Sequence, residues 1–175
     1  MESRVKVLGH PLHTILVAFP IGLLVTSFVF DLIAVFGDFP ELHVAAFWMI
    51  GAGVIGGLLA AIPGAIDFFT LPRHTRAWRV GALHGIGNVA VVMLFAISWL
   101  LRRELPAAPA AIPITLSLIA VGLACATAWL GGELVNRLGM GIDDGAHLDA
   151  PSSLSGRSAT DRATPPFTTR RPVKP

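Results

Sequence analysis

The sequence predicts an all-α integral membrane protein, folded as a four-helix bundle with up-down topology. Charged residues make up only 14% of the 175 residues, whereas hydrophobic residues make up 54%. The mean hydropathy is +0.70, and a soluble domain of this length would need far more charge to cover its surface. The charges lie in short clusters between long apolar stretches. The short connections predict that consecutive helices are antiparallel neighbours.

Four segments are long enough to cross a membrane, because about 20 apolar residues span the hydrocarbon core. These segments run from Leu12 to Phe36, from Val44 to Phe69, from Arg79 to Leu101 and from Ala110 to Asn136. The first segment is preceded by Arg4 and Lys6, and basic residues also precede the apolar stretch of a signal peptide. Its apolar stretch is too long for a signal sequence, and no small-residue cleavage site follows it. We therefore expect a retained span.

Small residues recur at a spacing of four on the last three segments. They are Gly53, Gly57, Ala61 and Ala65, then Gly81 and Gly85, then Ala124, Ala128 and Gly132. Helices in lipid gain little from burying leucine against leucine, so close backbone approach matters for their packing. The pattern therefore predicts grooves along which the helices pack.

The distribution of basic residues predicts the orientation. Six Lys and Arg residues flank one side of the spans, namely Arg4, Lys6, Arg73, Arg76, Arg79 and Arg137, against Arg102 and Arg103 on the other. Because loops rich in Lys and Arg stay in the cytoplasm, we expect both termini there. Residues 1–148 should form the transmembrane domain. Residues 149–175 are rich in Pro, Ser, Thr and Arg and should form a disordered cytoplasmic tail.

Each span brings titratable groups to the same predicted leaflet. These groups are His10 and His13 on the first span, Asp67 on the second, His84 with Asn88 on the third, and Glu133 on the fourth. Ionisable groups inside a membrane are costly unless they have a partner or a function. The helix dipoles favour neutral histidines near helix N-termini and disfavour carboxylates near C-termini. This combination suits a transition metal ion, or haem b held by one histidine from each of two spans, for example His13 and His84.

A purely structural interpretation accounts for most of the same residues. Glu133 can pair with Arg137, Asp67 can pair with an arginine of the following loop, and His10 can cap its helix. His84 fits this interpretation least, because it is the deepest group and has no charged neighbour on its own helix. On the opposite side, Asp31 and His43 are expected to form an interfacial pair.

Four stretches of the chain resemble a known family. "GHPLHTILVAFPIGL", "GAGVIGGLLAAIPGAIDF", "ALHGIGN" and "GGELVNRLGMGI", within residues 7–142, are similar to domain of unknown function 2231, a family of small bacterial membrane proteins. The resemblance implies four spans in the bacterial inner (plasma) membrane. The family's recurring polar positions correspond to His10, His13, Asp31, Asp67, His84, Asn88 and Glu133. Asn136 stands where members often carry tyrosine, which speaks against a tyrosine-dependent redox role.

Three functions remain open from sequence. The first is a metal or haem b module for electron transfer, with a redox partner. The second is a proton or ion translocation subunit that uses Asp67, His84, Asn88 and Glu133 and works as a homo-oligomer. The third is a structural membrane subunit without chemistry. No hydrolytic or nucleotide-binding motif is present, although a metal-dependent oxidoreductase remains possible. We expect the lipid bilayer, and no nucleic acid, as a partner.

Overall fold

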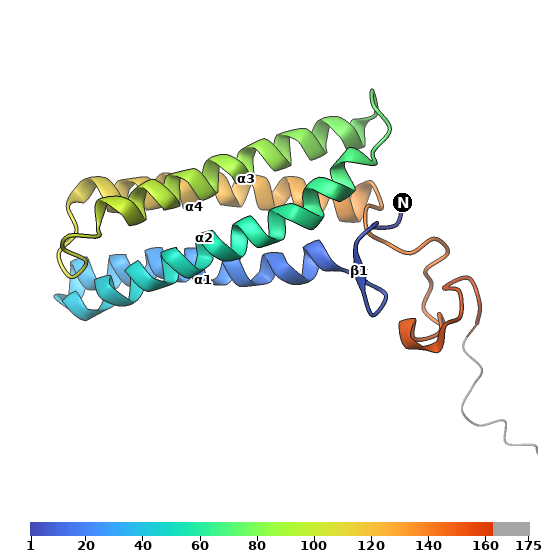
Figure 1. Cartoon of the computed structure of the whole chain (residues 1–175), viewed down its shortest axis with the longest axis horizontal. Helices are drawn as coiled ribbons and strands as arrows, with labels where there is room; N and C mark the ends of the chain where they lie inside the picture. The colour runs from blue at the N-terminus through green and yellow to red at the C-terminus, as the bar shows by residue number, and fades with distance from the viewer. Residues whose placement is uncertain (163–175) are drawn as a thin grey trace, which may run out of the picture.

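The computed structural model describes residues 1–162, and within them four long helices form an up-down bundle (Figure 1). The helices are α1 Leu12–Gly37, α2 Pro40–Phe69, α3 Arg76–Leu101 and α4 Ala111–Gly132. A π-helical turn, η1 Glu133–Arg137, continues α4. All four helices are long and apolar enough to cross a membrane. The predicted fold class is therefore confirmed.

The helix boundaries follow from local chemistry. α2 begins at Pro40, four residues before the predicted start, because a proline in the first turn loses no hydrogen bond. α3 begins at Arg76, where the hydroxyl of Thr75 accepts the N–H of Trp78 and caps the helix. α1 ends at Asp38, whose backbone is left-handed (φ 55°) and whose N–H donates to the carbonyl of Ala34.

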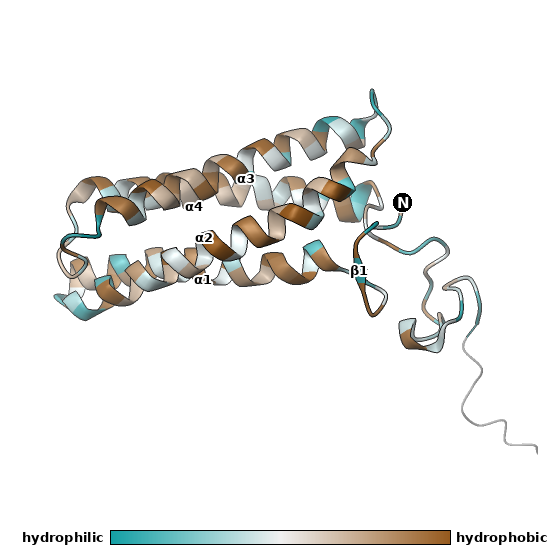
Figure 2. Ribbon diagram, viewed as in Figure 1, coloured by the Kyte–Doolittle hydropathy of each residue, from teal (hydrophilic) through white to brown (hydrophobic). Residues whose placement is uncertain are grey.

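The centre of the bundle is an apolar core to which each long helix contributes. Its buried residues are Leu24, Ile50, Val91, Phe95 and Ala120. The glycines of α2 allow close approach to its neighbours, as their spacing predicted. An added Cβ at Gly53 would lie 2.6 Å from the side chain of Leu24, and one at Gly57 would lie 3.0 Å from Val92. Figure 2 shows hydrophobic residues along the helices and hydrophilic residues mainly at their ends.

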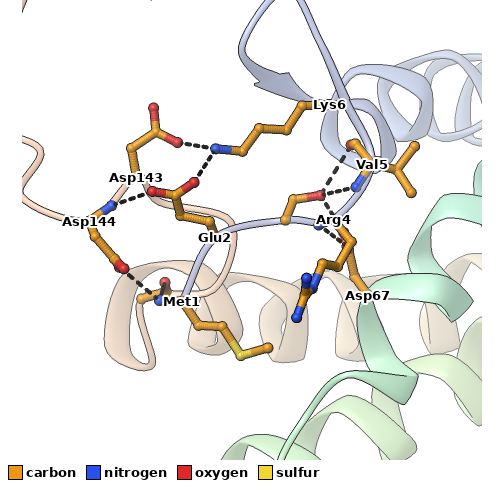
Figure 3. Close-up of polar contacts among 10 residues, drawn as sticks. Met1, Glu2, Arg4, Val5, Lys6, Asp67, Asp143 and Asp144 are labelled. Atoms are coloured by element: carbon orange, nitrogen blue, oxygen red, sulfur yellow. Dashed lines mark hydrogen bonds and ion pairs between the residues drawn. The ribbon is translucent and has the colours of Figure 1, made fainter. Parts of the chain in front are cut away.

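The segment before α1 folds back over one end of the bundle. We call residues 1–11 the N-terminal strap; it contains a hairpin of β1 Lys6–Val7 and β2 His10–Pro11. Figure 3 shows how the strap holds two distant segments together. The Ser3 hydroxyl and the Arg4 N–H donate to the carboxylate of Asp67 at the end of α2. Lys6 pairs with Glu2 and with Asp143, which follows α4.

The predicted tail begins at residue 149, and part of it is described. Residues 149–162 are irregular apart from a short 3₁₀ helix, η2 Ser153–Ser155. The remainder of that prediction concerns residues 163–175, which lie outside the described residues.

The ion pairs of the strap give a pH prediction. The hydrogen bond from Lys6 holds the pKa of Glu2 below its ordinary value of 4.5. A carboxyl with a lowered folded-state pKa stabilises the fold above its unfolded pKa, and that contribution is lost as pH falls through the folded value. A carbon-13 NMR titration should therefore place the Glu2 midpoint below 4.5. In Lys6→Met the midpoint should return toward 4.5, and equal midpoints in the two proteins would contradict the assignment.

Candidate functional site

Two histidines that the sequence places on different spans meet inside the bundle. His13 lies in the first turn of α1, and His84 lies on α3. Their ring centres are 6.4 Å apart, and the ring planes are nearly perpendicular at 87°. Both side chains are half-buried. The pair named from sequence as an example of haem ligands is therefore brought together in the structure.

The hydrogen bonds of the two rings fix which nitrogen carries the proton in the neutral form. His13 Nδ1 lies 2.8 Å from the carbonyl oxygen of Ala60, and His84 Nδ1 lies 2.9 Å from that of Thr127. A carbonyl can only accept, so Nδ1 must be the donor in both rings. Nε2 of each neutral ring then carries a lone pair, which is the form that binds a metal.

A glycine on a neighbouring helix makes room for each ring. An added Cβ at Gly64 on α2 would lie 2.7 Å from His13 Nδ1, closer than real Cβ contacts occur. An added Cβ at Gly131 on α4 would lie 3.1 Å from His84 Cε1. These glycines let the imidazoles pack directly against the helix backbones.

Gly64→Ala is expected to push His13 out of its position and to destabilise the protein by about 1–3 kcal/mol through overpacking. Gly85→Ala is the matched control, because an added Cβ there meets nothing within 4 Å and alanine is the better helix former. Chemical unfolding in detergent measures both variants. Equal stability of the two variants would show that the His13 contact with Gly64 is not tight.

The other titratable residues that were predicted to lie in the same leaflet are not part of the His13–His84 pair. Asp67 is bound by the strap, not by an arginine of the following loop. Glu133 pairs with Arg76 at 2.5 Å, where its own-helix neighbour Arg137 was expected. His10 is exposed. Within residues 1–162, no group of three or more His, Cys, Asp or Glu side chains is placed to hold a metal ion. Of the five residues predicted as ligands, the structure therefore brings only His13 and His84 close to each other.

Asn88 lies beside His84, as its spacing of four predicted. Its amide nitrogen is 2.9 Å from the His84 carbonyl oxygen, and its Oδ1 accepts from the Thr127 hydroxyl at 3.0 Å. Thr127 on α4 was not singled out in the sequence, because a threonine in an apolar span gives no distinctive signal. Its role emerges only from the packing of α3 against α4.

The opposite end of the bundle contains a buried ion cluster. Asp31, fully buried on α1, contacts Arg102 through both carboxylate oxygens and lies 2.8 Å from His43 Nδ1. Asp31 Oδ2 lies 2.8 Å from Arg102 Nη2 and forms an ion pair with it, but the angles of this contact are not those of a hydrogen bond. Arg102, 1% exposed, also donates to Ser98 and Ser117. We call these five residues the ionic clasp; they join α1 to α4.

The ionic clasp corrects one expectation and leaves another standing as a prediction. Asp31 and His43, expected to form an interfacial pair, do meet, and both are buried within the protein. Arg102 was counted as a loop charge, although it is enclosed by the helix ends. The available signal was an arginine directly after one span and an aspartate at a comparable depth in another. Arg103, the next residue, is exposed as expected.

Comparison with known proteins gives one family. The model of the family described as "Predicted membrane protein (DUF2231)" matches residues 9–144. Neither a curated protein nor a solved structure matches the chain. The matched region contains both histidines of the pair and the whole ionic clasp.

Proposed function

Since the chain belongs to the DUF2231 family of predicted membrane proteins, we propose that it is a membrane-embedded electron-transfer module that binds haem b through His13 and His84. One observation carries the proposal. Two imidazoles from separate helices meet within the bundle, and each has its Nδ1 engaged by a backbone carbonyl. This arrangement leaves Nε2 of both rings available as ligands.

The separation of the rings fits a shared metal. A metal–nitrogen bond of about 2 Å on each side would place two imidazole centres about 6 Å apart, and the observed separation is 6.4 Å. A bare zinc-type ion is usually held by three or four protein ligands. Haem iron needs protein ligands only at its axial positions. A site with two histidines therefore favours haem b over a bare transition metal ion.

Haem b, when bound, would supply a centre that takes up and releases one electron. The bilayer would surround the module, and a redox partner would have to deliver or remove that electron. The strap closes the polar end of the bundle close to the pair, since Asp67, its contact on α2, lies about one turn beyond Gly64. We therefore expect electron exchange on this side of the membrane.

The same end carries the exposed arginines Arg4, Arg73, Arg76, Arg79 and Arg137. Burial of Arg102 leaves Arg103 as the exposed arginine of the opposite side among the described residues. This asymmetry supports the proposal that both termini face the cytoplasm in the bacterial inner membrane. A fluorescent reporter fused after residue 148 should be active in the cytoplasm, and a periplasmic reporter at the same position should be silent. The reverse result would overturn the orientation.

Translocation of protons or ions is the less favoured function. The His13–His84 pair and the ionic clasp are about 27 Å apart along α1, judged from 1.5 Å per residue. Between them lies the apolar core of Leu24, Ile50, Val91, Phe95 and Ala120. A path through one chain would have to cross this apolar barrier. A structural role alone would need no more than the Nδ1 hydrogen bonds that fix each ring.

Haem titration tests the proposed function. Haem b is added to the full chain, purified in detergent, while the absorption spectrum is recorded, and a separate sample is analysed for transition metals. We expect a saturable Soret band at one haem per chain and no stoichiometric bare metal. A chain that binds no haem, whether or not it holds a transition metal, would overturn the proposal.

A further inference from the structure

We propose that Asn88 and Thr127 are positioning residues that hold the His84 ring in the tautomer and orientation required of an axial ligand. The inference rests on the proposed function only for the identity of the bound group. The tautomer itself is a property of the protein without any ligand.

Thr127 contacts the histidine and the asparagine at once. Its backbone carbonyl oxygen accepts from His84 Nδ1 at 2.9 Å. Its hydroxyl lies 3.0 Å from Asn88 Oδ1 and 3.0 Å from the Ala124 carbonyl oxygen, and these two acceptors share its one proton. The residue is 3% exposed, so water cannot readily replace these bonds. A single buried residue of α4 therefore orients two side chains of α3.

The orientation of the Asn88 amide follows from its acceptors and donors. Its nitrogen lies 2.9 Å from the carbonyl oxygen of His84, which can only accept. A flipped amide would place Oδ1 against that oxygen and would lose the bond. In this orientation Oδ1 lies against the Thr127 hydroxyl and accepts from it, sharing the hydroxyl proton with the Ala124 carbonyl oxygen. The amide N–H groups are thus directed to His84.

The amide lies over the face of the His84 ring and not in its plane. Its nitrogen is 3.4 Å from Nδ1 and 3.2 Å from Nε2. An in-plane position almost equidistant from both nitrogens would collide with Cε1, which lies between them. The amide therefore does not occupy the in-plane lone-pair direction of Nε2, and it restricts rotation of the ring. This arrangement fixes the ring without using the lone pair of the ligand atom.

Nitrogen-15 NMR of His84 in the haem-free protein tests the inference directly. In the wild type we expect a protonated Nδ1 and an unprotonated Nε2. Thr127→Val removes the hydroxyl and leaves Asn88 Oδ1 without its donor, and Asn88→Leu removes the amide. In both variants the ring is free to turn from the Thr127 carbonyl, so part of the population should carry the proton on Nε2. Thr127→Ser keeps the hydroxyl and should give the wild-type spectrum.

Haem affinity supplies the second measurement. Loss of groups that orient a metal-binding histidine typically costs 10–100-fold in affinity, and we expect a loss of about that size in Thr127→Val and Asn88→Leu but not in Thr127→Ser. Tautomer shifts in a protein that binds no haem would uphold the positioning role and overturn the proposed function. Unchanged ring spectra and unchanged affinity in both variants would overturn the positioning role.

Discussion

Arg102→Ala is expected to destabilise the bundle by about 3–5 kcal/mol, the usual cost of breaking a buried ion pair. The substitution removes both guanidinium contacts from Asp31, whose carboxylate has no exposed surface. It also removes the donors to Ser98 and Ser117. His43 alone then faces an uncompensated negative charge inside the protein. Unfolding by denaturant in detergent, followed by circular dichroism, measures the loss.

Arg103→Ala is the matched control, because it removes an exposed arginine one position along the chain and should change stability by less than about 0.5 kcal/mol. The double variant Asp31→Leu, Arg102→Met should recover most of the loss, since apolar residues often replace a buried pair without cost. If Arg102→Ala and Arg103→Ala unfold at the same denaturant concentration, the ionic clasp does not stabilise the bundle.

On the proposed function, His13→Ala and His84→Ala are each expected to abolish haem binding through two histidines, which is the largest functional effect expected. Each variant removes one of the two imidazoles whose Nε2 atoms are available. The remaining histidine could ligate only one side of the iron. Haem bound per chain and the position of the Soret band after purification measure the effect.

His10→Ala is the control that tests whether haem binding depends on His13 and not on the nearby His10. His10 belongs to the same His-Pro-x-His motif as His13, yet it lies in β2 and is exposed. The variant should keep the haem content and the spectrum of the wild type. Loss of haem in His10→Ala together with retention in His84→Ala would contradict the assigned ligand pair.

The spans could be predicted from sequence because membrane thickness constrains them directly. The four predicted segments begin within four residues of the observed helices, and the helix starts differ where Pro40 and Thr75 set the first turn. The antiparallel arrangement of consecutive helices could be predicted because the loops between them are short. The meeting of His13 and His84 was foreseeable because α1 and α3 run parallel in an up-down bundle and both histidines lie near the same end of these helices.

The partners of the charged residues could not be predicted in the same way. Asp67 and Glu133 bind groups from the strap and from α3, and these contacts depend on how distant segments fold back. Arg102 follows α3, where an arginine ordinarily extends to the membrane surface. Only the packing of all the long helices encloses it beside Asp31. Hydropathy reports depth along a helix and does not report which side chains face each other.

Electron paramagnetic resonance of the ferric, haem-loaded full chain tests the central claim most directly. The ring planes of His13 and His84 are nearly perpendicular. If both imidazoles held the iron, the ferric iron would have two strong nitrogen ligands and would give a low-spin signal. We predict this signal in the wild type and its replacement by a high-spin signal, or by no haem signal, in His84→Ala. A high-spin signal in the wild type, or no bound haem iron, would contradict the account.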